Sequence, residues 1–309
     1  MWNYVIPHFN QFLGELELPV EDRTDGESKA NRVARSLFAD YYPGQAFDSS
    51  CYALVGSYGK GTAAKPRTDI DLIFVLPYQE FTRFDALTGN KQSQLLQDVK
   101  FSLLDTFPST DIRGDGPVAK VPFSTYDFEV CPVFRLPNGF LTAHTKNGGS
   151  WQYTNPAAEM QWLRNVDTAT HGKATHLVKM LKAWKRECNV DMKSISLETM
   201  AILFVNQWIF KDKDIWYYDW MVRDFFEYLL RYVNGWVQPA GITERIQLGD
   251  GWQSKCQTAY ARAVKACEYE HDDKDMTATM EWQKLFGSQF AITFPRLNLF
   301  SALVGGSQT

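Results

Sequence analysis

The chain has 309 residues, of which 45% are hydrophobic and 15% aromatic, enough for one large domain or two joined lobes with buried cores. Its formal net charge is −4, so it lacks the basic excess typical of proteins that bind long nucleic acids. No uncharged run approaches the roughly 18 residues that span a membrane.

The first residues have neither the basic start nor the apolar stretch of a signal peptide. The five cysteines are scattered through the sequence with no Cys-x-x-Cys spacing, which favours reduced thiols over disulfides or a structural zinc site. We therefore expect a cytoplasmic protein that contacts no membrane.

Hydrophobic periodicity changes character half-way along the chain. Helices and strands alternate first: a helix near 28–42, strands at 51–56 and 70–76, a helix at 91–106, and strands at 118–123 and 126–134. After a turn-rich stretch at 135–156 the pattern is almost wholly helical, with helices at 157–165, 173–187, 195–210, 219–233, 254–270 and 277–287. This order predicts an α+β fold with a mixed sheet in a first lobe (1–150, with an N-terminal helix) and a second, helical lobe (151–309).

The predicted strand at 70–76 begins at a pair of carboxylates that follows a glycine-rich turn. Gly56 and Ser57 end one apolar strand, and Asp69 and Asp71 stand at the start of the next. Residues two apart on a strand project from the same side, and carboxylates at the entry to a buried strand are costly unless something pairs them. Two other Asp-x-Asp pairs lie in lysine-rich runs typical of exposed loops. The first pair therefore indicates a seat for a metal-bound polyphosphate.

A third carboxylate is predicted on the strand at 126–134. Asp127 and Glu129 alternate with apolar residues, so they share one face of that strand, and Pro132 is expected to stop or bulge it. Either acid could serve as a further metal ligand, and an edge strand with a solvated face is the alternative.

The helix at 173–187 has an apolar stripe and a face carrying Lys179, Lys182 and Arg186. Such a face is ordinarily solvated, but beside the acidic motif it is the natural place to offset phosphate charge. Lys60, Lys65 and Arg67, next to the glycine-rich turn, are further candidates.

These motifs together resemble those of the DNA-polymerase-β-type nucleotidyltransferases. Within that group the chain resembles the bacterial cyclic-oligonucleotide synthases (CD-NTases) related to animal cyclic GMP–AMP synthase and oligoadenylate synthetase. The family pattern of Gly-Ser, a dozen residues and Asp-x-Asp is matched by Gly56, Ser57, Asp69 and Asp71. The acid-Val-x-Pro pattern of its third acid selects Glu129.

Two later segments also match the family. Lys182 stands where the Leu-x-Lys-x-Trp helix supplies a lysine to the triphosphate. Ser194 stands where a Lys-Ser segment contacts it, whereas Ile195 and Ser196 replace the family's aromatic residue and histidine.

The resemblance implies an active site in the cleft between the lobes, with two Mg²⁺ or Mn²⁺ ions held by Asp69, Asp71 and Glu129. The nucleotide would be bound by Gly56, Ser57, Lys182 and Ser194. It implies that NTPs, including ATP or GTP, are joined into a cyclic di- or trinucleotide for anti-phage defence, and that an effector is reached only through the product. The alternatives are nucleotidyl transfer to an RNA 3′ end or a protein, and an inactive nucleotide-sensing relative.

Overall fold

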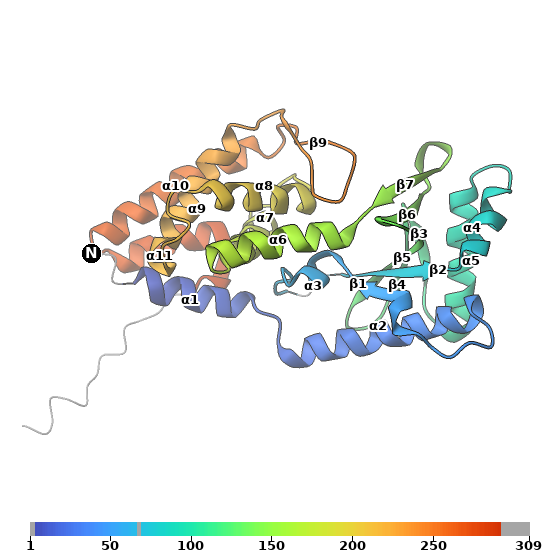
Figure 1. Ribbon diagram of the computed structural model, residues 1–309. Helices are drawn as coiled ribbons and strands as arrows, with labels where there is room; N and C mark the ends of the chain where they lie inside the picture. The colour runs from blue at the N-terminus through green and yellow to red at the C-terminus, as the bar shows by residue number, and fades with distance from the viewer. Residues whose placement is uncertain (1–3, 67–68, 292–309) are drawn as a thin grey trace, which may run out of the picture.

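The computed structural model describes residues 4–66 and 69–291. A seven-stranded sheet with α2, α4 and α5 forms one end of the molecule, and α1 and α7 to α11 form the other (Figure 1). The α-helices of the described part are α1 (Val5–Leu16), α2 (Val20–Tyr41), α3 (Gly56–Lys60), α4 (Tyr78–Asp85), α5 (Lys91–Thr106), α6 (Pro156–Thr170), α7 (Lys173–Glu187), α8 (Ser194–Gln207), α9 (Tyr218–Leu230), α10 (Gln253–His271) and α11 (Asp275–Phe286). Helix α6 runs from the sheet to the helical end.

The sheet is mixed, as expected for the predicted α+β fold. Its strands are β1 (Tyr52–Leu54), β2 (Ile70–Leu76), β3 (Arg113–Asp115), β4 (Val118–Pro122), β5 (Asp127–Leu136), β6 (Gly139–His144) and β7 (Ser150–Thr154). The order is β1-β2-β5-β4-β3, and β6 joins β5 to β7. Strands β2 and β5 are parallel, with Asp71 opposite Glu129, and the other pairings are antiparallel.

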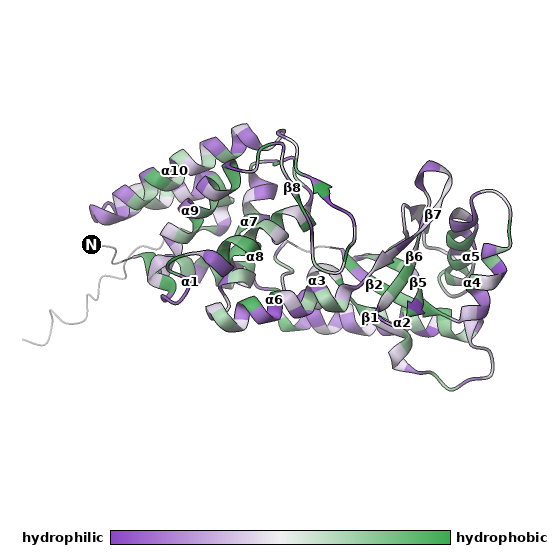
Figure 2. Cartoon of the chain, turned by 45° about the horizontal axis from the view of Figure 1, so that its top comes forward, coloured by the Kyte–Doolittle hydropathy of each residue, from purple (hydrophilic) through white to green (hydrophobic). Residues whose placement is uncertain are grey.

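Alternation along β2 and β5 divides their side chains between a core and a cavity. Leu72 and Phe74 of β2, with Phe128 of β5, are fully buried in a core shared with α2 and α5. These central strands are strongly hydrophobic in Figure 2. Asp71 and Glu129 lie at the alternate positions, so both side chains face away from α2 and α5.

The helical end has a separate hydrophobic core, and α1 belongs to it. Phe9 and Phe12 of α1 are fully buried among residues of α7 to α11. The division at residues 150 and 151 stays a prediction, although α1 comes first in the chain and packs with the second half. A short β8 (Trp236–Val237) pairs antiparallel with β9 (Ile246–Gln247), and β8 contacts α8.

Three local predictions were wrong. The stretch at 135–156 contains the hairpin strands β6 and β7, and the glycine-rich turn is a short helix, α3. Strand β5 continues through Pro132, which falls between the residues that pair with β4 and those that pair with β6. A missing N–H is tolerated there because no antiparallel partner is paired with that residue.

Candidate functional site

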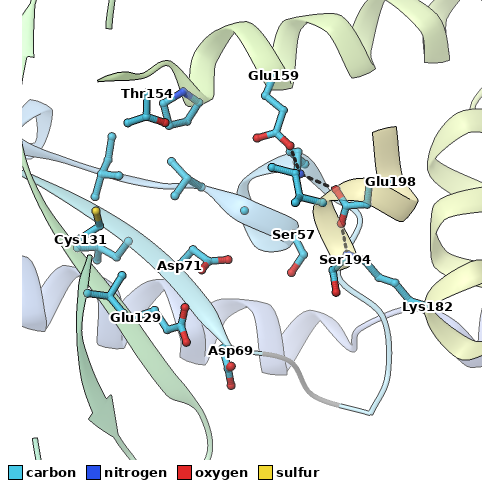
Figure 3. Close-up of a pocket in the computed structure, with 18 of the residues that line it drawn as sticks. Ser57, Asp69, Asp71, Glu129, Cys131, Thr154, Glu159, Lys182, Ser194 and Glu198 are labelled. Atoms are coloured by element: carbon cyan, nitrogen blue, oxygen red, sulfur yellow. Dashed lines mark hydrogen bonds and ion pairs between the residues drawn. The ribbon is translucent and has the colours of Figure 1, made fainter. Parts of the chain in front are cut away.

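A cavity of about 1070 Å³ lies between the sheet and the helical end. It is lined by all seven residues that the sequence predicted for the site: Gly56, Ser57, Asp69, Asp71, Glu129, Lys182 and Ser194. The acids lie on the sheet side and Lys182 and Ser194 on the helical side (Figure 3). The structure therefore brings the predicted set together, from elements more than 130 residues apart in the chain.

The strand register places two of the acids beside each other. Asp71 on β2 and Glu129 on β5 are direct partners in the parallel pairing, and Asp69 lies one residue before β2 and is exposed. Burial raises the pKa of Asp71 to about 6, with Glu129 and Asp69 adding to the rise and Lys60 and Lys182 opposing it. Burial and the charge of Glu129 also raise the pKa of Asp69. This group of carboxylates is therefore short of positive charge.

Glu129 has a basic neighbour that the sequence analysis did not consider. The ammonium group of Lys120, opposite Glu129 on β4, lies 2.9 Å from its carboxylate and 3.1 Å from that of Asp115. Asp127, the alternative third acid, is exposed at the start of β5 and does not line the cavity. The structure thus places Glu129 rather than Asp127 on the cavity wall.

The Gly-Ser turn lies close against Asp71. Gly56 has a φ of +56°, and a β-carbon added there would lie 1.8 Å from Oδ2 of Asp71. Any other residue would be both strained and in collision. The next residue, Ser57, points into the cavity from α3 (Figure 3).

The helical wall contains a buried group of charges that joins α3 to the second half of the chain. Glu198 of α8 lies 2.7 Å from the ammonium group of Lys182 and 2.5 Å from that of Lys60, and Lys60 also lies 2.6 Å from Glu159 of α6. Lys182 further donates to the backbone oxygen of Thr62 at 3.1 Å. Although burial opposes ionisation, the two ammonium groups lower the pKa of Glu198.

The cationic face predicted on α7 is only partly at the site. Lys182 and Arg186 line the cavity, as does Lys185, which donates to Ser194 Oγ at 3.0 Å. Lys179 instead pairs with Glu17, outside the cavity. Of the three candidates beside the turn, Lys60 lines the cavity, Lys65 does not, and Arg67 lies outside the described residues.

The carboxylates offer the hard oxygen donors that Mg²⁺ and Mn²⁺ prefer. As they stand, no three histidine, cysteine, aspartate or glutamate side chains among residues 4–66 and 69–291 are placed to hold a metal ion. Binding would require the acids to converge, a rotation open to the exposed side chain of Asp69. The raised pKa of Asp71 shows that a cation would relieve an unfavourable charge group there.

Three charged residues of the cavity wall, Glu159, Lys185 and Glu198, were given no role from the sequence. Lys60 was one of several candidates beside the turn. Their pairings join positions 99 and 138 residues apart, which local patterns do not reveal. One signal was available, because Glu198 follows Ser194 by four residues and so shares its helix face.

Comparison with known proteins agrees with this arrangement. Residues 4–167 match the family described as Second Messenger Oligonucleotide or Dinucleotide Synthetase domain, over more than half of the chain. The chain belongs to this family. The resemblance to the CD-NTases is thereby confirmed.

The chain is similar in sequence to a curated protein, a cyclic AMP-AMP-AMP synthase from Acinetobacter sp. (strain ATCC 27244 / 9458). The two are 27% identical over 184 residues, which cover 59% of this chain and 50% of the relative. The match therefore spans about half the length of that protein.

Solved structures of the family's relatives show the same fold. E. coli MS115-1 CdnC with ATP matches with a TM-score of 0.68 and 19% identity, over 92% of this chain and 98% of that one. Vibrio cholerae DncV cyclic AMP-GMP synthase, in complex with a linear intermediate, matches with a TM-score of 0.70 and 13% identity, over 91% and 97%. The CD-NTase CdnG of Bradyrhizobium diazoefficiens, in complex with GTP, matches with a TM-score of 0.68 and 11% identity, over 93% and 95%. The predicted α+β nucleotidyltransferase fold is confirmed.

Within the described residues, no helix is both long enough and apolar enough to cross a membrane.

Proposed function

We propose that the protein is a metal-dependent nucleotidyltransferase that joins NTPs into a cyclic di- or trinucleotide second messenger. The observation that carries this proposal is the arrangement of the cavity: the three predicted acids line its sheet side, and the cationic side chains of α7 line its helical side. A metal-bound triphosphate needs both kinds of partner on opposite sides.

The acids Asp69, Asp71 and Glu129 would hold two divalent cations, Mg²⁺ or Mn²⁺. When bound, such ions offset phosphate charge and make a ribose hydroxyl easier to deprotonate. The register that pairs Asp71 with Glu129 holds these two donors side by side on the sheet, so only Asp69 would have to rotate toward the ions.

The helical wall would bind the donor triphosphate. Lys182 and Ser194 would contact its outer phosphates, and Ser57 with Gly56 would hold it from the sheet side. The protein's contribution is then to position the attacking ribose hydroxyl oxygen near the α-phosphorus and to stabilise charge as pyrophosphate leaves.

Family membership supports a cyclic product, since the family is described by oligonucleotide and dinucleotide synthesis and the curated relative is a cyclic AMP-AMP-AMP synthase. CdnC and CdnG were solved with ATP and GTP respectively, which supports purine NTPs as substrates here. We further propose a role in anti-phage defence, with an effector that responds to the product alone.

The test is a product assay with all four NTPs and Mg²⁺ or Mn²⁺. After phosphatase treatment, mass spectrometry should find a resistant cyclic nucleotide that is absent from the Asp69→Asn/Asp71→Asn variant. Transfer only when RNA or a protein is added would instead indicate the acceptor-dependent alternative. A linear product from NTPs alone would contradict the cyclic product. Nucleotide binding without turnover under all these conditions would indicate an inactive sensor.

A further inference from the structure

The buried charges behind the cavity have an unequal arrangement. Lys60 has two carboxylate partners, Glu159 and Glu198, whereas Lys182 has Glu198 alone among the ion pairs of residues 4–66 and 69–291. Both lysine side chains are nearly enclosed, with 5% of Lys60 and 13% of Lys182 exposed. Removing Glu198 would therefore leave Lys182 without a carboxylate partner, and removing Glu159 would not.

Glu198 also links the two sides of the cavity. It belongs to α8, one turn after Ser194, and its two oxygens are divided between Lys182 of α7 and Lys60 of α3 (Figure 3). Helix α3 begins at Gly56 and Ser57. Through Lys60, this carboxylate therefore contacts the helix that carries the turn beside Asp71, and through Lys182 it contacts the helical wall.

We propose that Glu198 is a positioning residue that holds Lys182 oriented toward the cavity in which the triphosphate and Asp71 meet. This proposal rests on the proposed function. It assigns Glu198 an effect on nucleotide binding that passes through Lys182.

Electrostatics supports the proposal. Burial lowers the pKa of Lys182 even with Glu198 in contact, whereas the pKa of Lys60 stays raised by its two carboxylates despite burial. Without Glu198, Lys60 would keep Glu159 as a carboxylate partner, whereas the ion pairs of residues 4–66 and 69–291 offer Lys182 no other.

The experiment compares two matched variants, Glu198→Gln and Glu159→Gln. Each removes one buried carboxylate from the same cluster and leaves a side chain of similar shape. The dissociation constant of a nonhydrolysable ATP or GTP analogue with Mg²⁺ should rise about tenfold or more in Glu198→Gln, because a charge-assisted contact behind Lys182 is lost. In Glu159→Gln it should rise less than about threefold. In turnover, KM should rise more than kcat falls.

A double-mutant cycle with Lys182→Met tests the route of the effect. In that background Glu198→Gln should change the analogue's affinity by less than about twofold, since the side chain it orients is gone. The double variant removes one positive and one negative charge and leaves the Lys60–Glu159 pair. If Glu198→Gln alone does not fold, the double variant can still be compared with Lys182→Met.

Three outcomes would overturn the proposal. Equal losses of affinity in Glu198→Gln and Glu159→Gln would show that the cluster acts only as a whole. A full further loss in the Lys182→Met background would show that Glu198 does not act through Lys182. A lowered Tm with unchanged affinity would show that Glu198 only stabilises the fold. If the wild-type protein neither binds the analogue nor forms product, the proposed function itself fails.

Discussion

At the scale of single residues, the site is defined by charges held close together on the sheet. Asp71 has the clearest consequence, because it stands between Glu129 and the Gly56 turn with little solvent around it. Its carboxylate belongs to the proposed chemistry but weakens the nucleotide-free fold. Where like charges are brought together to bind a ligand, the protein without that ligand is expected to be less stable.

We predict that Asp71→Asn abolishes turnover and stabilises the nucleotide-free protein. The pKa of Asp71 rises from 3.8 to about 6 in the folded state, so folding favours the protonated acid. Its contribution to stability is full below the unfolded pKa and is lost as pH rises through about 6. At about pH 8 without metal, urea unfolding should show a gain of about 3 kcal/mol for the variant, since each pKa unit corresponds to about 1.4 kcal/mol.

The control for Asp71→Asn is Asp105→Asn, which changes an exposed aspartate of α5. Its stability should stay within about 0.5 kcal/mol of wild type at every pH. The gain from Asp71→Asn should also disappear near pH 4, where the carboxyl is largely protonated in the folded state. A pH-independent gain would contradict the electrostatic explanation.

At the scale of helices and strands, the sequence predicted regular elements well where apolar periodicity was long. The helix at 91–106 and the strand at 70–76 have the predicted bounds. The helix α1 (Val5–Leu16) was not predicted from the sequence. In the structure Pro7 lies in the first turn, where its missing N–H would have had no helical partner.

The site, too, could be predicted only as far as local sequence patterns reach. The Gly-Ser and Asp-x-Asp motif could be recognised from local spacing, and the resemblance to the family selected Glu129 over Asp127. The pairing of Lys120 with Glu129 depends on which strand lies beside β5, and the contacts of Glu198 depend on how α3 docks against α8. Such contacts follow from tertiary packing, which local patterns in one sequence do not specify.

The packing of α1 can be tested with Phe9→Ala. Phe9 is fully buried, and its ring centroid lies 5.5 Å from that of Trp282 and 5.4 Å from that of Phe290. Removing the ring should cost about 3 to 5 kcal/mol of unfolding free energy, measured by denaturant titration with tryptophan fluorescence. Ile209→Ala, at a position that is 81% exposed, should change it by less than about 0.5 kcal/mol. Equal losses would show that α1 does not pack as described.

At the scale of the whole molecule, the cavity lies between two hydrophobic cores. The core around β2, β5, α2 and α5 is distinct from the core around α1 and α7 to α11. The cavity takes its predicted metal-binding acids from the side of the first core and the cationic side chains of α7 from the side of the second. A ligand that touches both walls therefore links two units that otherwise have separate interiors.

This arrangement predicts that metal and triphosphate stabilise the protein together more than separately. The acids would hold the metal and Lys182 the phosphates, so each ligand should bind more tightly when the other is present. Mg²⁺ with a nonhydrolysable NTP analogue should raise Tm by about 2 °C or more, and by more than the sum of the shifts with Mg²⁺ alone and with the analogue alone. The Asp212→Asn variant, changed at an exposed aspartate outside the cavity, should keep this excess, and Asp71→Asn should lose it. Purely additive shifts in the wild-type protein would mean that metal and triphosphate do not share the cavity.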